Sequence, residues 1–346
     1  MKRMKFFSLC LVLGLSVSTL ATAGCGGDTT MTGPGPVTQD PNPNPNPNPN
    51  PNPNPTPMET SLAGTLTMSQ TVSGIVNITD DVTLAAGATL TLSPGTVVKF
   101  ATNKSLTVRG TLSATGTAQS KIVFQGKDAA TAGTWGSIAV ASGGSASLAY
   151  VEIRHASQAV QALAGSTLTL DHALIEMSSK ALILRTSATI TKTVIHALGT
   201  SQSGSPIDIS DSSPTFTDLL VDQGNSGQDH ITVTGAAASP QFDHVEITGC
   251  HCAFHFNSGT GINVTNSYIH DNFYGLMLYS TKGVKFSNSN LVTDKTAHFG
   301  VCSTGGTLTS TGNWLSAPTA AFDGTCTGQT NTAPAASMLQ GVGYRP

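Results

Sequence analysis

Hydrophobic and polar positions recur at intervals of about 22 residues along the chain from Ser145 onward. Each copy has an apolar anchor, a polar residue two places later and a second apolar residue five places after the anchor, as in LAYVEI, FDHVEI and VTNSYI. The anchors are Leu148, Leu170, Ile190, Phe216, Phe242, Val264, Phe286 and, in a looser eighth copy, Leu308. Successive anchors keep roughly the same interval, which is longest on both sides of Phe216. A repeat of this length predicts a solenoid, in which each unit stacks on the one before.

A second series of alternating apolar residues lies between the anchors. Its members are Leu182/Leu184, Ile207/Ile209, Ile231/Val233, Phe254/Phe256, Leu276/Leu278 and Phe299/Val301. Strict alternation between Gly, Ser, Asn and Asp turns predicts short strands, about three in each repeat, and no helical period is present. We therefore expect an all-β fold, a parallel β-helix of about 11–12 coils stacked about 4.8 Å apart.

The best-preserved repeats resemble those of a known family. NVTNSYIHDNFYGLMLYSTKGVKFSNSNLV is similar to the repeat of right-handed, pectin-lyase-like β-helices of the NosD or CASH type, and LAAGATLTLSPGTVVKF followed by WGSIAV resembles the start of many bacterial surface β-helices. The resemblance covers roughly residues 61–315 and implies a right-handed coil. That family includes lyases, hydrolases, carbohydrate binders and inert scaffolds, so the fold does not decide the function.

The segment that precedes the repeats predicts export and a spacer. Residues 1–24 begin with a basic segment and continue with an apolar run too short to span a bilayer, as a signal peptide does. Thr22-Ala23-Gly24-Cys25 resembles a bacterial lipobox, in which Cys25 would carry the lipid, although Ala21-Thr22-Ala23 would also suit ordinary signal peptidase. Residues 25–60 include seven consecutive Pro-Asn pairs, which exclude helix and sheet and predict a disordered or polyproline II stalk. The β-helix is then expected at 61–328, with a cap or tail at 329–346.

Composition and charge narrow the classes of function. Charged residues make up only 10% of the chain, which argues against a helical bundle with charged outer faces. Removal of Lys2, Arg3 and Lys5 with the leader leaves 13 basic residues against 19 acidic ones, a formal charge of −6. A chain with this balance offers no basic surface for nucleic acid.

Outward positions of the second strand series supply the candidate ligand-binding residues. The central outward column is expected to hold Gln161, Ile183, Asp208, Thr232, His255, Met277 and Gly300. This column and the outward positions on either side of it are expected to form a polar strip, which consists of Arg185, Asp208, His230, His255, Asn257 and Tyr279. Such a strip would bind a sugar chain through hydrogen bonds and aromatic contact, although exposed strand positions are polar in any case.

Catalysis is the alternative for the same strip, with Asp208, Arg185, His230 and His255 as its residues. A lyase of this fold would need a carboxylate cluster for Ca²⁺ and an Arg or Lys base, and Asp208 is the lone acid of its column. The paired carboxylates of a glycoside hydrolase are also missing from the pattern. We therefore expect no catalytic residues and no cofactor, and Ca²⁺ only if the protein is a lyase.

The turn after each anchor strand forms a third set, which we call the turn column: Tyr150, His172, Lys192, Asp218, His244, Asn266 and Asn288. Asn in such turns adopts the left-handed backbone conformation and forms hydrogen bonds along the stack. The residue types are otherwise mixed, so we expect Asn266 and Asn288 to be structural and the column not to be a binding site.

The cysteines suggest one disulfide and leave one pair open. The interval from Cys302 to Cys326 is close to one coil, so these two cysteines are expected to stack and form a disulfide in an exported protein. Cys250, Cys252 and His255 have spacings that permit a metal site, but strand alternation places Cys252 and His255 on opposite faces. We expect no metal there, and pairing of Cys250 with Cys252, or of either with a cysteine far along the chain, is the alternative.

Together these features predict a non-catalytic outer-membrane lipoprotein at the cell surface, or otherwise a secreted or periplasmic protein. Its expected partners are a polysaccharide or an envelope protein, with the membrane reached through the N-terminal lipid and no nucleic acid. Adhesion or scaffolding is the expected role, and a polysaccharide lyase or glycoside hydrolase is the alternative.

Overall fold

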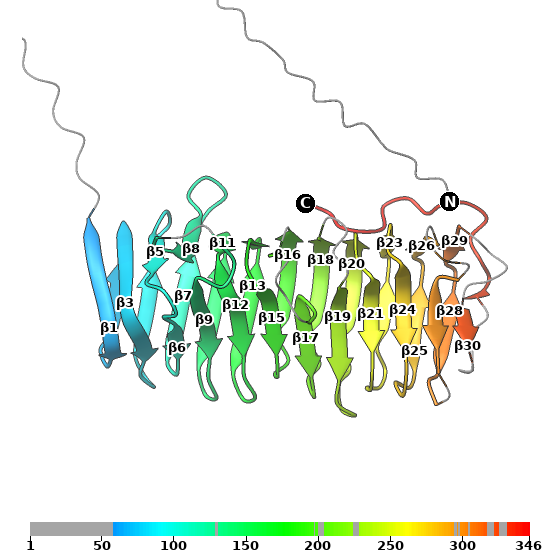
Figure 1. The fold of residues 1–346 in the computed structure, drawn as a ribbon, viewed down its shortest axis with the longest axis horizontal. Helices are drawn as coiled ribbons and strands as arrows, with labels where there is room; N and C mark the ends of the chain where they lie inside the picture. The colour runs from blue at the N-terminus through cyan, green and yellow to red at the C-terminus, as the bar shows by residue number, and fades with distance from the viewer. Residues whose placement is uncertain are drawn as a thin grey trace, which may run out of the picture. The chain divides into compact units, whose positions relative to one another are not determined.

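The described part of the chain consists of short strands and turns, and it contains no helix. The computed structural model describes residues 58–346 except 129–130, 197, 200–203, 224–227, 294–295, 297, 304, 317–321 and 325–330. The chain forms about eleven turns of about 22 residues, which confirms the predicted all-β parallel solenoid. Figure 1 shows the strands side by side along one long axis.

Three parallel sheets run the length of the stack, and the chain passes through sheet C, sheet A and sheet B in each coil. Long strands bend at a corner and belong to two sheets. Sheet A contains β1 (Glu59–Leu66), β3 (Ile75–Leu84), β5 (Val97–Phe100), β8 (Ile122–Gly126), β11 (Val151–Arg154), β14 (Leu174–Glu176), β16 (Thr189–His196), β18 (Thr215–Asp222), β20 (Gln241–Thr248), β23 (Tyr268–His270), β26 (Asn290–Leu291) and β29 (Trp314–Leu315).

Sheet B carries the second series of the sequence pattern. After the second parts of β1 and β3 it contains β6 (Leu106–Val108), β9 (Trp135–Val140), β12 (Ala156–Ala162), β15 (Lys180–Leu184), β17 (Ile207–Ser210), β19 (Asp229–Thr234), β21 (Cys252–Phe256), β24 (Tyr274–Leu278), β27 (Gly300–Cys302) and β30 (Phe322–Gly324).

Sheet C carries the anchors. Besides the first parts of β16, β18 and β20 it contains β2 (Gln70–Val72), β4 (Thr89–Leu92), β7 (Thr111–Thr115), β10 (Ser145–Ala149), β13 (Thr167–Asp171), β22 (Asn263–Thr265), β25 (Val284–Ser287), β28 (Leu308–Thr311) and β31 (Asn331–Thr332).

The anchors stack on one another inside this triangle of sheets, as the repeat predicts. Leu148 lies in register with Leu170 and, further along, Phe242 with Val264. Buried rings continue the core, with Phe216 and Phe242 stacked at 4.9 Å between ring centroids. Burying a side chain of this size stabilises the fold by about 1.5–3 kcal/mol, so a continuous apolar column holds the coils together.

The predicted register is wrong in the last copy. Phe286 pairs with Ser310 and Val284 pairs with Leu308, because this coil is slightly longer than the coils just before it. On sheet B, Gly300 and Cys302 take the places expected for Phe299 and Val301. Phe299 is still buried, and a Cβ added to Gly275 would lie 2.0 Å from its ring, so this glycine makes room for it.

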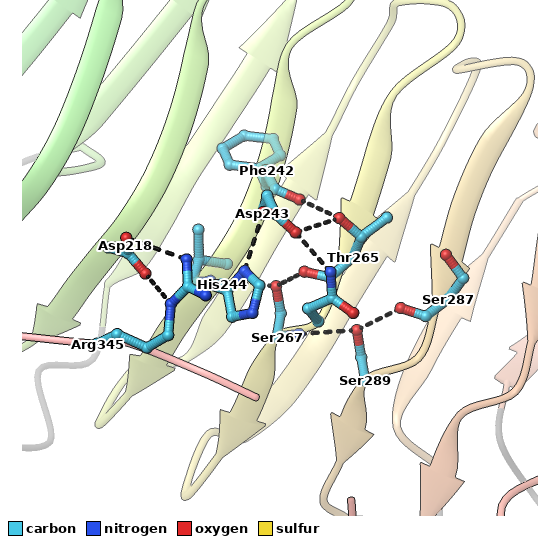
Figure 2. Close-up of polar contacts among 11 residues, drawn as sticks. Asp218, Phe242, Asp243, His244, Thr265, Ser267, Ser287, Ser289 and Arg345 are labelled. Atoms are coloured by element: carbon cyan, nitrogen blue, oxygen red, sulfur yellow. Dashed lines mark hydrogen bonds and ion pairs between the residues drawn. The ribbon is translucent and has the colours of Figure 1, made fainter. Parts of the chain in front are cut away.

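Every residue of the turn column has a left-handed backbone, with φ between 44° and 55°. Hydrogen bonds join one coil to the next beside this column: Asp243 Oδ1 accepts from Thr265 Oγ1 at 2.8 Å and from Asn266 Nδ2 at 2.7 Å (Figure 2). The same conformation at Tyr150, His172 and Lys192 shows that the stack, more than residue type, imposes it.

Residues at both ends of the chain extend beyond the repeat. Residues 1–57, including Cys25 and nearly all of the expected leader and linker, lie outside the described residues. None of the described residues belongs to a helix long and apolar enough to cross a membrane. After β31, residues 333–346, here called the tail, run back along the stack (Figure 1).

Candidate functional site

The outward surface of sheet B over β15, β17, β19, β21 and β24, here called the strand face, collects most of the predicted site residues. The strand register confirms the central column as far as Met277: Asp208 lies beside Thr232, Thr232 beside His255, and His255 beside Met277. The next position is Val301, not Gly300, because of the longer last coil.

Arg185 and Asp208 form a two-pronged ion pair on this face. Arg185 Nη1 and Nη2 donate to Asp208 Oδ1 and Oδ2, each at 3.3 Å, and Nη1 also donates to the Asp208 backbone carbonyl at 3.3 Å. Lys180 Nζ lies 4.0 Å from Asp208 Oδ2. The Asp208 carboxylate is therefore neutralised by two cations, and the guanidinium is fixed in orientation.

Asp229 is the centre of the second polar group. Its Oδ1 lies 2.9 Å from His251 Nδ1 and its Oδ2 lies 2.5 Å from His255 Nδ1. Burial disfavours the Asp229 carboxylate, but the hydrogen bonds from His255 and His251 outweigh this effect and hold its pKa below the usual value. Asp229 is thus a carboxylate that orients two imidazoles.

Aromatic rings from the next coil stack on both imidazoles. Tyr279 stacks on His255, with ring centroids 5.3 Å apart, and Phe273 stacks on His251 at 5.6 Å. Tyr279 is 37% exposed and Phe273 is 43% exposed, so each keeps part of a ring open to solvent. Neighbouring coils therefore present two ring stacks side by side.

A hollow of about 240 Å³ has the His255 imidazole in its wall. Its lining consists of Lys180, Gly204, Ser205, Asp208, Asp229, Thr232, His255 and Asn257. The predicted residues Asp208, His255 and Asn257 therefore meet in one place, with Arg185 and Tyr279 attached through Asp208 and His255. The hollow offers hydrogen-bonding groups of both kinds, donors and acceptors, and the ring that stacks on its His255 is Tyr279.

His230 does not belong to the strand face, and its prediction was wrong. Its side chain is completely buried, and neither ring nitrogen has a hydrogen-bond partner among the residues that the structure describes. Burial lowers the pKa of His230 to about 3, so the ring is neutral at ordinary pH. The alternation fails because His230 and Ile231 are both buried, and Asp229 points outward in place of His230.

The same break in alternation recurs along sheet B and could have been found in the sequence. Ala181 precedes Leu182 and Ala253 precedes Phe254, and all four are buried. A small apolar residue before the expected inward residue thus marks the corner of the coil. Counting from that corner places Lys180 and Asp229 at equivalent positions, each at the start of its strand. The sequence prediction of the site did not include these two residues, nor His251 and Phe273.

The cysteines and His255 do not converge on a metal. Cys250 Sγ donates to Asn272 Oδ1 at 3.0 Å, Cys252 Sγ donates to the Phe254 carbonyl at 2.9 Å, and His255 faces Asp229. Burial raises the pKa of the Cys252 thiol, which disfavours the thiolate that zinc requires. No group of three or more His, Cys, Asp and Glu residues in the described part of the chain could hold a metal ion.

The disulfide expected between Cys302 and Cys326 stays a prediction. Cys302 ends β27 and is buried, whereas Cys326 lies outside the described residues. Cys250 and Cys252 are both buried and are not joined to each other.

Comparison with known families now decides the relationship. The family model described as "Right handed beta helix region" matches residues 136–333, more than half of the chain. The chain belongs to the right-handed β-helix family. The handedness implied by the sequence resemblance is confirmed by this match, and the β-helix accounts for every strand described above.

More distant comparisons add little. The chain is similar to a solved structure, the A-module of the mannuronan C-5 epimerase AlgE4 of Azotobacter vinelandii, with 12% sequence identity and a TM-score of 0.31, over 79% of this chain and 91% of that chain. No curated protein matches the chain. The function therefore has to be argued from the site itself.

Proposed function

We propose that this protein is a cell-envelope lipoprotein that binds a polysaccharide on the strand face without cleaving it. In this proposal the β-helix displays the site, and adhesion of the cell to glycan follows from it. A role as a scaffold for an envelope protein is the related non-catalytic alternative.

The observation that carries the proposal is the pair of exposed ring stacks, Tyr279 on His255 and Phe273 on His251, beside the polar hollow. The apolar faces of sugar rings pack on aromatic rings, while sugar hydroxyls need donors and acceptors at the ring edges. Residues on adjacent coils are about 4.8 Å apart, so a chain of sugars lying along the stack would meet ring and polar groups together.

The engagement of the charged groups favours binding over catalysis. Arg185 would be the base of a lyase, yet its guanidinium donates to the Asp208 carboxylate and carbonyl. Both oxygens of Asp229 accept hydrogen bonds from imidazoles. Groups held in this way present a fixed hydrogen-bonding surface.

The attachment to the membrane rests on the sequence. The lipobox-like Thr22-Ala23-Gly24-Cys25 and the Pro-Asn stalk suit a domain tethered by a lipid on Cys25, and Gly26 after the cysteine suits the outer membrane. The stalk over residues 41–57 would extend about 50 Å in the polyproline II conformation. That length would hold the strand face clear of the lipid headgroups.

The test is a panel of neutral and acidic polysaccharides, with and without Ca²⁺, mixed with the purified protein and separated on a sizing column. The proposal expects at least one glycan to co-elute with the protein at unchanged chain length. Tyr279→Ala should remove that co-elution, whereas Met68→Ala, the loss of an exposed apolar side chain between β1 and β2, should not. Glycans that elute separately from the wild type would contradict the proposal.

One contact favours an enzyme as the second candidate. Asp229 and His255 form a carboxylate–imidazole pair at 2.5 Å inside the hollow, the arrangement that orients a general acid or base. In that case wild-type protein would shorten a glycan, and Asp229→Asn and His255→Ala would each abolish the shortening. His230, which the sequence offered as a catalytic residue of a lyase or hydrolase, takes no part in this alternative, because it is buried.

A further inference from the structure

The tail is hydrogen-bonded to the β-helix along the turn column. It follows the last strand and contributes no residue to the strand face. Ala335 N donates to the Asn313 carbonyl at 3.1 Å, and Gly343 N donates to the Asn266 carbonyl at 2.8 Å. Between these points the Asn290 side chain donates to the Leu339 carbonyl at 2.9 Å and accepts from Leu339 N at 2.8 Å. The tail therefore crosses successive coils toward the N-terminal end of the stack (Figure 1).

Its last residues are held by a charged contact. Arg345 Nε donates to Asp218 Oδ1 at 2.6 Å and Nη2 donates to Oδ2 at 3.2 Å, as Figure 2 shows. The Asp218 side chain is only 8% exposed, so the guanidinium neutralises an almost buried carboxylate. This contact fixes the position of the preceding residue, Tyr344.

Tyr344 forms one wall of a second hollow, of about 290 Å³, which we call the tail pocket. The opposite side is built from the start of the turn column, and the full lining is Ala118, Lys121, Tyr150, His172, Ala173, Leu174, Lys192, Val194 and Tyr344. Tyr150 and His172 are stacked there, with ring centroids 4.3 Å apart and 16° between the ring planes. The pocket thus has aromatic groups from both the β-helix and the tail.

The charges in this lining have one sign. Lys121 and Lys192 contribute ammonium groups, and none of the residues that line the pocket is an Asp or a Glu. The neighbouring carboxylates are already engaged: Glu152 Oε1 lies 2.9 Å from Lys121 Nζ, and Asp171 Oδ2 lies 2.8 Å from His172 Nδ1. Because Lys121 is held by Glu152, Lys192 is the cation of the lining that is better placed to meet a charged ligand.

We propose that the tail pocket is a second ligand site, which takes one sugar ring bearing a carboxylate, with Lys192 toward the carboxylate and Tyr344 against the ring. The volume suits a single ring, since it lies at the small end of the range for small-molecule sites. Aromatic walls select a flat apolar face, and Lys192 selects the negative charge. The site shares no residue with the strand face, so it stands independently of the function proposed there.

The test uses glucuronic acid and its methyl ester, which differ only in the charge of one group, titrated into the purified protein by calorimetry. The acid should bind at least about tenfold more tightly than the ester. Lys192→Gln should remove that preference, and Tyr344→Ala should weaken binding of the acid by about tenfold. Lys285→Gln, an exposed lysine on β25, is the matched control and should change nothing.

The outcomes separate the two sites. Tyr279→Ala on the strand face should leave binding of the acid unchanged, so failure of one site does not imply failure of the other. Equal binding of acid and ester would overturn the proposal, as would absence of binding, or unchanged binding in both Lys192→Gln and Tyr344→Ala. Thermal unfolding of each variant should match the wild type, since both side chains are partly exposed.

Discussion

The strand face and the tail pocket are built in opposite ways from the same repeat. On the strand face, neighbouring coils of one sheet supply rings, imidazoles and a carboxylate, each from a strand or from the residue directly next to one. In the tail pocket, the repeat supplies Tyr150, His172 and Lys192, and the last wall comes from Tyr344, outside the repeat. The stacked coils alone are thus enough to build the strand face. The tail pocket is complete only while the tail lies across the coils.

The two regions also differ in charge. The hollow on the strand face contains Asp208 and Asp229 beside Lys180 and His255, so opposite charges balance within it. The tail pocket contains two lysines and no acid among its lining residues. We expect the first to recognise hydroxyl patterns and ring faces, and the second to recognise negative charge.

The largest expected effect concerns the buried His230 beneath the strand face. Its pKa falls from an unfolded value of 6.5 to about 3, so the neutral ring stabilises the fold above pH 6.5 and this stability is lost as the pH falls toward 3. At about 1.4 kcal/mol per pKa unit, the loss between pH 7 and pH 4 is about 3 kcal/mol.

His230→Leu should remove most of that difference in urea unfolding measured at the two pH values, because leucine does not titrate. His172→Leu, which changes a partly exposed histidine on the turn column, is the control and should keep the wild-type difference. An equal pH dependence in wild type and His230→Leu would contradict the assignment of the acid sensitivity to His230.

The second effect concerns the exposed rings. Tyr279→Ala should weaken binding of the selected glycan by about tenfold, and Phe273→Ala by a similar factor, because each removes a stacking surface near the centre of the site. Calorimetry with the intact glycan measures both. If the double variant bound as tightly as the wild type, the strand face would not be the site.

Salt gives a smaller effect that separates the two regions. Raising the ionic strength from 0.05 to 0.2 M should weaken binding of glucuronic acid in the tail pocket by about threefold, because screening acts on exposed lysines. Glycan binding on the strand face should change by less than that, since its charges are already paired. If salt weakened binding equally at both sites, the proposed difference in charge between the strand face and the tail pocket would be contradicted.

The smallest effect is local. Arg345→Gln should loosen the end of the tail without unfolding the β-helix, because the remaining tail contacts through Asn290 and Asn313 persist. Hydrogen exchange at the Gly343 amide should rise, while exchange in β18 and β20 stays as in the wild type. Unchanged exchange at Gly343 would mean that the Asp218 contact does not hold the tail.

The sequence predicted the parts of the fold that the repeat determines. The anchors, the parallel coils and the outward column from Asp208 to Met277 follow from alternation and from the regular length of the repeat. Of the candidate strip, the sequence placed Arg185, Asp208, His255, Asn257 and Tyr279 on the face where the structure has them, but it placed His230 on the wrong face. Alternation is broken at the coil corner, where the buried His230 occupies the small-residue position that Ala253 fills in the next coil.

The remainder depended on contacts that no repeat encodes. Asp218 and Arg345 are 127 residues apart in the chain, and the tail has no periodic pattern that would place it on the turn column. The turn column was expected to be structural only, because its residue types are mixed. Its role in the tail pocket comes from the tail that lies across it.

A crystal structure of the protein with the intact glycan that co-elutes with it would show directly whether the strand face binds sugar. We expect sugar rings packed against Tyr279 and Phe273, with hydroxyl groups bound in the hollow beside Asp229 and Asn257, and the glycan at its original length. A glycan found only away from the strand face, or one cleaved within the hollow, would contradict this expectation.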